Sequence, residues 1–172
     1  MPDTPAAAPP RQIYMIYIRA TPQQVWDAIV KPEYTSQYFF GSRVQTSARA
    51  GEPIRHVAPD GTTLWGDDAV LESDPPRRLV HTWQPLYDAE LQAEPPSRVT
   101  WDIEPQPGGV TRVTVTHDQL EHSPKTASHV NGGWMFILSS MKTLLETARP
   151  LTDRSAGTIS APDAAAISDA DA

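Results

Sequence analysis

The chain has 172 residues, a formal net charge of −7 and no cysteine. Its length suits one domain with a substantial core, and the lack of cysteine excludes disulfides, iron–sulfur clusters and thiolate zinc sites. An acidic balance without a basic stripe argues against nucleic acid or an anionic membrane surface as the main partner, and no apolar run reaches the roughly 18–20 residues that span a bilayer.

The two ends of the chain differ in composition from its middle. Residues 1–10 are rich in proline and alanine, and residues 151–172 are rich in alanine, serine and aspartate. Such segments bury little apolar surface, so we expect disordered tails at 1–10 and 151–172, the second one acidic, around one domain at 11–150. No charged segment followed by an apolar one, as in a secretory signal, occurs at the N-terminus, so we expect a cytoplasmic protein.

A strand and two short helices are predicted first. Residues 13–18 are apolar at every position, which predicts a strand covered on both faces at least in part. Thr21 followed by Pro22 is typical of a helix start, and the apolar stripe that follows predicts a helix that ends before Pro32. Residues 33–40 predict a second helix, which ends in a dense aromatic group: Tyr38, Phe39 and Phe40.

From residue 42 onward the apolar pattern changes to a period of two, which predicts a run of about six strands. They are expected at 43–48, 52–58, 63–73, 78–84, 98–104 and 110–120. The last two alternate cleanly between apolar and polar residues, so one face of their sheet is buried and the other meets water. Residues 85–97 contain three prolines and several acids, which predicts a long loop.

Residues 123–150 predict one long amphipathic helix. Ser123 and Pro124 suit its start and Pro150 its end. Apolar residues at steps of three and four form one broad face, which includes Trp134, Leu138, Met141 and Leu145. Gly132 and Gly133 are poor helix formers, so the helix has either loose first turns or a start near these glycines. An antiparallel sheet with helices on one face, an α+β architecture, is the economical packing.

Several segments together resemble a known superfamily. They are residues 20–28, residues 66–76 ahead of 78–83, residues 111–117, and Gly133-Trp134 with residues 141–146. Their order and spacing resemble the START-like superfamily (SRPBCC), also called the helix-grip or Bet-v-type fold. Within it, the chain is most similar to the group named for the activator of heat shock protein 90 ATPase. The likeness spans residues 13–149.

The resemblance implies a helix-grip fold, with a pocket between its two main parts. A curved antiparallel sheet of about seven strands would wrap around the long C-terminal helix, and two short helices would follow the first strand. The resemblance does not imply one chemistry, because this fold carries lipid carriers, hormone binders, cyclases and chaperone regulators.

The expected pocket combines aromatic, apolar and histidine side chains. Its lining is predicted to be Tyr38, Phe39, His56, His81, Trp83, Trp101, His117, Trp134 and Leu138. Three tryptophans directed at one space either fill it or line it with flat walls. A histidine on an apolar strand face is more often structural than functional, and in the functional interpretation one or two histidines orient a polar ligand group or move a proton. Tyr17 is a further candidate for that role.

Other site chemistries find little support in the sequence. The five histidines have no compact metal-ligand spacing, so we predict neither a metal nor a cofactor. Asp67 and Asp68 are interpreted as solvated charges at a strand edge rather than an acid–base pair. We assign no catalytic residue.

The leading hypothesis is a binding protein that encloses a small hydrophobic, aromatic or lipid-like ligand between sheet and helix. One alternative is a cyclase- or dehydratase-like enzyme that uses a pocket histidine or Tyr17. The other is a protein–protein module that regulates a chaperone or another partner. A void of several hundred Å³ under the last helix would favour binding, whereas a filled interior would favour a surface role. The sequence does not fix the oligomeric state.

Overall fold

The computed structural model describes residues 10–152. The tails expected at 1–10 and 151–172 lie outside this range, apart from residues 10, 151 and 152. In chain order the elements are β1 (Gln12–Ile18), α1 (Pro22–Val30), α2 (Pro32–Tyr38), β2 (Arg43–Thr46), β3 (Pro53–Val57), β4 (Leu64–Asp74), β5 (Arg78–Trp83), α3 (Ala89–Gln92), β6 (Ser97–Gln106), β7 (Val110–Asp118), α4 (Pro124–Val130) and α5 (Gly133–Thr147).

Local sequence signals account for the start of α1. The Thr21 side chain accepts a hydrogen bond from the backbone N–H of Gln24, and the Gln24 side chain accepts one from the backbone N–H of Thr21. This reciprocal pair satisfies two donors that a helix start otherwise leaves free, and Pro22 lacks the N–H that would be a third. Residues Val25, Trp26, Ala28 and Ile29 form the buried face of the helix.

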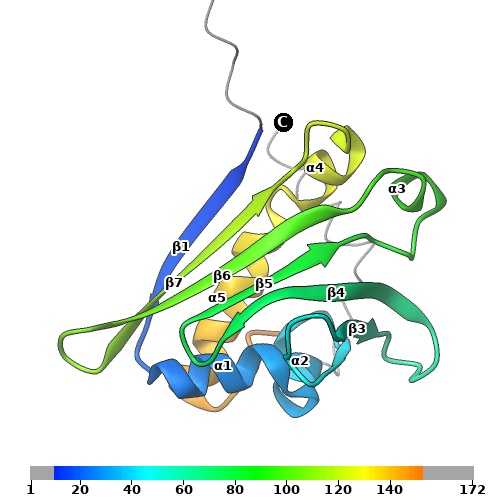
Figure 1. The fold of residues 1–172 in the computed structure, drawn as a ribbon. Coiled ribbons are helices and arrows are strands. Elements are labelled where there is room, and N and C mark those ends of the chain that lie inside the picture. Colours follow the sequence, from blue (N-terminus) through cyan, green and yellow to red (C-terminus); the bar gives the residue numbers. More distant parts are fainter. Residues whose placement is uncertain (1–9, 153–172) are drawn as a thin grey trace, which may run out of the picture.

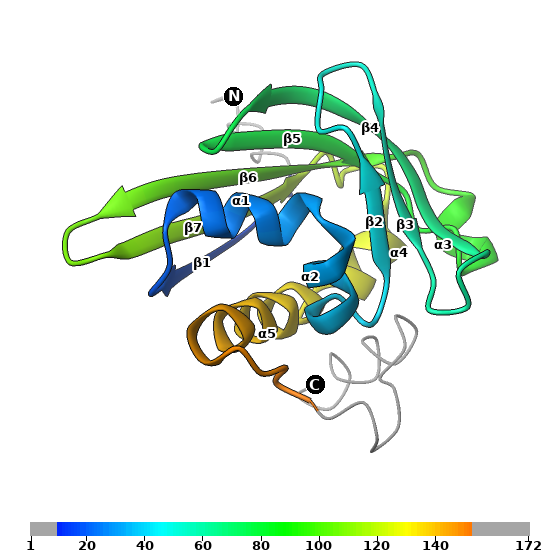
Figure 2. The same ribbon diagram turned by 90° about the horizontal axis from the view of Figure 1, so that it is seen from below.

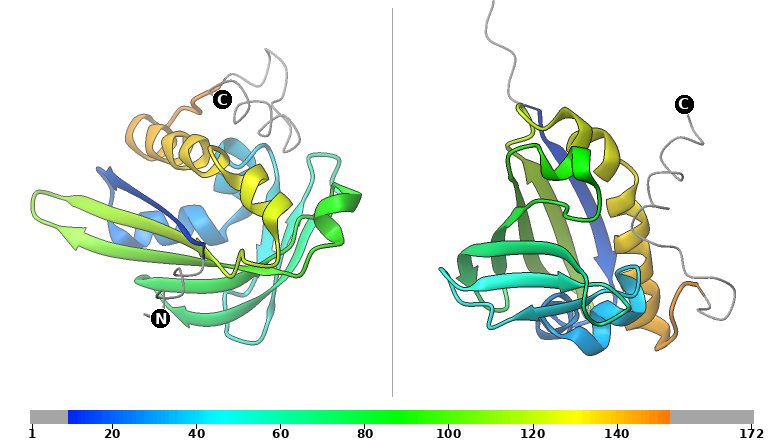
Figure 3. Two further views of the ribbon diagram at one scale, coloured as in Figure 1. Left: turned by 90° about the horizontal axis from the view of Figure 1, so that it is seen from above. Right: turned by 90° about the vertical axis from the view of Figure 1, so that its right-hand side faces the viewer.

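The seven strands form one antiparallel sheet in the order β1-β7-β6-β5-β4-β3-β2. The sheet is curved and does not close on itself (Figure 1). Helix α5 crosses its concave face, α1 and α2 lie at one end of the space between them, and α3 and α4 lie at the other (Figures 2 and 3). The α+β helix-grip fold expected from the resemblance is therefore confirmed.

The core lies between the concave face of the sheet and α5. Val99, Trp101 and Ile103 of β6 and Val113 and Val115 of β7 are buried on that face, as their alternation predicts. Trp134, Ile137, Leu138, Met141 and Leu144 form the facing side of α5. This register places β5, β6 and β7 side chains directly under the helix.

The prediction of one helix over 123–150 was wrong, whereas the alternative of a helix start near Gly132 and Gly133 is confirmed, because α5 begins at Gly133. The segment 123–150 forms two helices, α4 and α5, because Gly132 between them adopts φ +84°, a conformation that glycine reaches without strain. A four-residue helix, α3, also interrupts the expected loop at 85–97.

The first strand forms as predicted, but only one of its faces is well covered. Strand β1 is an edge strand, and Ile13, Met15 and Tyr17 on its outer face are half exposed. An apolar run does not by itself show which face is covered. Among the described residues, no helix is long and apolar enough to cross a membrane.

Candidate functional site

Aromatic rings occupy most of the space between the sheet and α5. The Trp134 ring lies 5.3 Å from that of Trp83 and 5.5 Å from that of Trp101, measured between ring centroids. Phe39 contacts both Trp83 and Trp134 at 6.2 and 6.3 Å. These separations are ordinary aromatic packing distances, so the three indoles largely fill the space that they could have lined.

His81 is held by two hydrogen bonds of defined direction. Its Nδ1 lies 2.7 Å from the carbonyl oxygen of Thr82, which only accepts, so Nδ1 carries the proton. Its Nε2 accepts a hydrogen bond from Trp101 Nε1 at 3.2 Å, so Nε2 is bare. Burial lowers the pKa of His81 to about 4. His81 is therefore neutral near pH 7, with both ring nitrogens occupied.

His117 has the opposite tautomer for the same reason. Trp134 Nε1 donates to its Nδ1 at 3.0 Å, so the proton lies on Nε2, which donates to Ser97 Oγ at 2.7 Å. The Ser97 hydroxyl in turn donates to the carbonyl oxygen of Trp83 at 3.1 Å. Burial lowers the pKa of His117 to about 3. This chain of bonds fixes the tryptophan at the start of α5 to strands β6 and β7.

His56 differs from the other two interior histidines. Its ring stacks on Phe39 at 4.8 Å, and its Nδ1 lies 3.5 Å from Ser42 Oγ, at the limit of a hydrogen bond. Within the described residues its Nε2 makes no hydrogen bond. Burial lowers the pKa of His56 to about 3. Of the three, His56 alone keeps a ring nitrogen free for another group.

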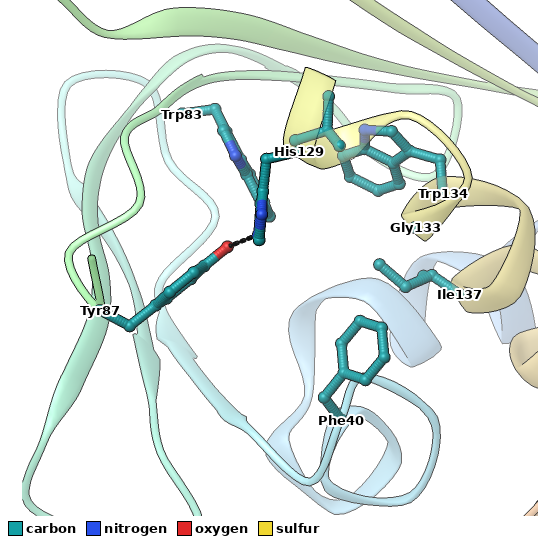
Figure 4. A pocket seen from close by; sticks show the side chains of 8 residues that line it. Phe40, Trp83, Tyr87, His129, Gly133, Trp134 and Ile137 are labelled. Carbon is teal, nitrogen blue, oxygen red and sulfur yellow. Dashed lines mark hydrogen bonds between the residues drawn. The ribbon is translucent and has the colours of Figure 1, made fainter. Parts of the chain in front are cut away.

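A small apolar cavity remains at the junction of α4 and α5. It is lined by Phe40, Trp83, Tyr87, His129, Val130, Gly133, Trp134 and Ile137 (Figure 4). Its volume is about 40 Å³, whereas pockets for drug-sized ligands hold about 300 Å³ or more. The roomy interior that would have favoured binding is therefore not present in this conformation, because the indole rings occupy it.

One hydrogen bond closes this cavity on the side of the α3 loop. The Tyr87 hydroxyl lies 2.7 Å from His129 Nε2, which joins the segment after β5 to α4 (Figure 4). Burial raises the pKa of Tyr87 and lowers that of His129, so a neutral hydroxyl donating to a neutral imidazole is the stable form near pH 7. Trp65 packs edge-on against Tyr87 at 6.1 Å and supports it from β4.

A second cavity of about 20 Å³ lies on the other side of Trp83 and Tyr87. Its lining is His56, Trp65, Gly66, Asp68, Trp83, Gln84, Pro85 and Tyr87. Asp68 is only 8% exposed, so the interpretation of Asp67 and Asp68 as two solvated charges was wrong for Asp68. Side chains alternate along a strand, and Asp68 shares the buried face of β4 with Gly66 and Val70.

In the described part of the chain, one buried side-chain nitrogen or oxygen has no hydrogen-bond partner. It is Nε1 of Trp83. A buried N–H without an acceptor costs about 1–3 kcal/mol. The Trp83 ring lines both cavities, so an acceptor that reached Nε1 from the cavity it faces could recover this energy.

The predicted pocket residues have separate positions in the structure. Trp83 and Trp134 line the first cavity, and His56 and Trp83 line the second. The others pack in the surrounding interior: Tyr38, Phe39, His81, Trp101, His117 and Leu138. The Tyr38 hydroxyl is occupied, since it donates to the carbonyl oxygen of Ala28 at 2.7 Å. Tyr17 lies on the exposed face of β1, outside the interior.

Sequence reasoning did not place Tyr87, His129, Val130 and Ile137 at a cavity. Tyr87 and His129 are 42 residues apart and meet only because the α3 loop folds against α4. Val130 of α4 and Ile137 of α5 are apolar residues at helical spacing, and such a pattern indicates burial but does not indicate a cavity. The usable signal was the pair Gly132-Gly133, which marks where the apolar face of the predicted helix is interrupted.

A larger groove of about 610 Å³ lies on the surface between α1 and the β2–β3 and β4–β5 turns. Polar and charged side chains contribute to it, including Lys31, Thr46, Arg49 and Ser73. None of the predicted pocket residues lines it. Among residues 10–152, no group of three His, Asp or Glu side chains is arranged to hold a metal ion.

Comparison with known proteins identifies one family. The family described as "Activator of Hsp90 ATPase homolog 1-like protein" matches residues 19–146. Comparison with curated protein sequences found no match.

Several solved structures share the fold at low sequence identity. Protein MLL2253 from Mesorhizobium loti has a TM-score of 0.66 and 19% identity, over 80% of this chain and 97% of its own. CalU16 from Micromonospora echinospora has a TM-score of 0.65 and 20% identity, over 97% and 89%. A protein from Colwellia psychrerythraea, described as the Aha1 dimer, has a TM-score of 0.63 and 17% identity, over 80% and 97%.

Proposed function

Because this chain belongs to the Activator of Hsp90 ATPase homolog 1-like family, in which the fold is compatible with small-ligand binding, we propose that it binds a small hydrophobic ligand that contains an aromatic ring. The ligand would lie between the sheet and α5, at the junction of α4 and α5. The observation that carries this proposal is the apolar cavity at that junction, with Trp83, Trp134 and Phe40 as walls.

Affinity would come from apolar burial and ring contacts. Removal of apolar surface from water contributes about 25 cal/mol per Å², and aromatic pairs add about 0.5–1.5 kcal/mol each. The ring faces of Trp83 and Trp134 would supply such pairs. The phenyl ring of Phe40 lies against Phe136 of α5 at 5.5 Å and would form the floor.

The cavity must enlarge to admit a ring, and the surrounding segments can move at low cost. The Tyr87–His129 hydrogen bond contributes only about 0.5–1.5 kcal/mol to stability, so an open state in which water solvates both groups costs little free energy. Gly132 gives the α4–α5 junction backbone freedom that other residues lack. Outward movement of Tyr87 with the α3 loop would join the two cavities, because both are lined by Trp83 and Tyr87.

The proposal is tested by titration of ¹⁵N-labelled protein with aromatic hydrocarbons, lipids and flavonoids. The five tryptophan indole N–H signals report binding directly, and a Trp83→Phe sample assigns the Trp83 signal. We expect saturable shifts that are concentrated at Trp83 and Trp134. A folded sample that shows no shift with any of these compounds would refute the proposal.

A matched pair of variants separates the cavity from the helix surface. Ile137 lines the cavity, whereas Met135 on the same helix is 62% exposed. Ile137→Phe places extra carbon atoms in the cavity and should weaken binding about tenfold or more. Met135→Phe adds a similar group in water and should leave binding unchanged. Equal effects of the two variants would place the ligand elsewhere.

The enzyme alternative requires a group that can take up a proton near pH 7. His81 and His117 have both ring nitrogens occupied and low pKa values, so they are poorly suited to that role. Tyr17 faces outward. His56 has a free Nε2 but an equally low pKa of about 3, so acid–base chemistry in the interior would depend on Asp68, whose pKa burial raises to about 7.

Two observations favour the protein–protein alternative. The indole rings largely fill the interior, and the apolar side chains of Ile13, Met15 and Tyr17 on edge strand β1 are half exposed. Exposed apolar stripes on edge strands are typical contact surfaces. The partner to test first is a second copy of the chain. Sedimentation equilibrium should show a dimer that Met15→Lys dissociates, and a monomer at all concentrations would remove this support.

A further inference from the structure

The second cavity differs in chemistry from the first, although the two share Trp83 and Tyr87. The first is walled mainly by apolar and aromatic groups, whereas the second adds the Asp68 carboxyl and the His56 imidazole. It lies between β3 and β4 and the segment that follows β5. Three of the polar side chains that line it, those of Asp68, His56 and Trp83, come from three different strands.

The Asp68 carboxyl is buried without a cation. Its Oδ1 accepts a hydrogen bond from Thr82 Oγ1 at 2.8 Å, and the backbone N–H of Gln84 also faces the group. Arg55 on the neighbouring strand β3 forms its ion pair with Asp67, with Arg55 Nε 2.7 Å from Asp67 Oδ1. In the described part of the chain no ion pair reaches Asp68.

The absence of a side chain at Gly66 leaves room for the second carboxyl oxygen. A Cβ at Gly66 would lie 3.1 Å from Asp68 Oδ2 and 3.9 Å from His56 Cδ2. Oδ2 and the His56 ring therefore border the same small space, next to Trp83. Gly66 is paired with His56 across β3 and β4, so the backbone fixes this arrangement.

Stability does not explain this arrangement, because a buried carboxyl without a cation opposes folding. Burial raises the pKa of Asp68 to about 7, while the Thr82 and Gln84 hydrogen bonds act in the opposite direction. Trp83, whose N–H has no partner, and His56, whose Nε2 is free, line the same cavity as Asp68. Unsatisfied groups that converge on one cavity are typical of a binding site.

We propose that Asp68, with Trp83 and His56, forms a polar subsite that selects ligands with a hydroxyl group on the aromatic ring. This subsite rests on the proposed binding function. The ring would lie in the first cavity and its hydroxyl in the second. That hydroxyl donates a hydrogen bond to Asp68 Oδ2 and accepts one from an N–H group such as Trp83 Nε1. A ligand ammonium group could donate to Asp68 but could not accept from an N–H group, because it has no lone pair.

The test compares 2-naphthol with 2-methylnaphthalene, in which a methyl group replaces the hydroxyl. Both compounds are titrated at pH 8 into the full ¹⁵N-labelled chain, and the dissociation constants are read from the tryptophan indole signals. We expect 2-naphthol to bind at least tenfold more tightly, since a hydrogen bond to a charged group is worth about 1.5–3 kcal/mol, and 1.4 kcal/mol corresponds to tenfold.

Three variants locate the source of that preference. Asp68→Asn should reduce it to threefold or less, because the hydrogen bond loses its charge. Gly66→Ala should also reduce it, because the new Cβ crowds Asp68 Oδ2 without a change in charge. Asp67→Asn is the control, because this neighbouring carboxyl is exposed and bonded to Arg55, and it should leave the preference intact.

The outcomes separate this subsite from the binding function on which it rests. Equal binding of the two naphthalenes, or a preference that survives in Asp68→Asn, would overturn the subsite and leave the binding function standing. Binding of neither compound to folded wild-type protein would overturn both. A stronger response to 2-(aminomethyl)naphthalene than to 2-naphthol would also overturn the subsite, because it would indicate recognition of a cation.

Discussion

Replacement of Asp68 by asparagine should make the protein more stable at neutral and alkaline pH. The side chain keeps its shape and its acceptor for Thr82 Oγ1, while the charge disappears. The pKa of Asp68 rises from 3.8 to about 7 on folding because burial disfavours the ionised form. At 1.36 kcal/mol per pKa unit, this shift corresponds to roughly 4 kcal/mol at pH values above 7.

The sign of the effect follows from proton binding. Between pH 3.8 and about 7 the folded state holds a proton on Asp68 that the unfolded state has lost, so the free energy of unfolding falls as pH rises. Asparagine does not titrate. The stability difference between variant and wild type should therefore grow with pH, by roughly 2.3 kcal/mol between pH 5 and 7, and level off above about pH 8.

The measurement is urea unfolding followed by tryptophan fluorescence at pH 5, 6, 7 and 8. The other titratable groups near Asp68 are Asp67 on its own strand, His56 on β3, His81 on β5 and Tyr87 in the loop. They are present in both proteins, so the difference isolates Asp68. Asp67→Asn, at an exposed site, should change stability by less than about 0.5 kcal/mol. A pH-independent difference between the Asp68→Asn variant and wild type would refute the reasoning.

Three further predictions concern the surrounding interior. Trp134→Ala should cost roughly 3–5 kcal/mol in urea unfolding, because Trp134 is only 1% exposed and donates to His117; a loss below 1 kcal/mol would contradict that packing. Acidification from pH 6.5 to 4 should lower the urea midpoint, because His56, His81 and His117 have lower pKa values in the folded state and therefore bind protons mainly when the chain is unfolded. Their combined destabilisation exceeds the stabilisation that protonation of Asp68 gives over the same pH range. A midpoint that rose on acidification would contradict these histidine pKa values. Tyr87→Phe removes the hydrogen bond to His129, which closes the cavity lined by Trp83. Hydrogen exchange of the Trp83 indole N–H should therefore accelerate about 2- to 10-fold. An unchanged exchange rate would show that this bond does not control opening of the cavity.

Much of the fold followed from local patterns in the sequence. Thr21-Pro22 marked the start of α1, and clean alternation in β6 and β7 marked which side chains face α5. These signals act over a few residues and need no knowledge of the partner element. The glycine pair Gly132-Gly133 left two alternatives for the helix start, because the apolar stripe continues across the glycines while the backbone turns.

The candidate site was harder to predict than the fold, because it depends on contacts between distant segments. The Tyr87–His129 pair joins a loop to a helix, and no spacing rule connects the two. The free volume depends on how three indole rings share a space, which their positions on strands do not fix. The position of Asp68 was open to prediction, since alternation from Gly66 to Val70 places it on the buried face of β4.

A crystal structure of the protein with 2-naphthol would test the account most directly. The account predicts the ring between Trp83 and Trp134 at the α4–α5 junction, the hydroxyl within hydrogen-bond distance of Asp68 Oδ2, and a Tyr87–His129 separation well above the present 2.7 Å. An unchanged interior, with the compound on the surface or in the groove beside α1, would contradict it.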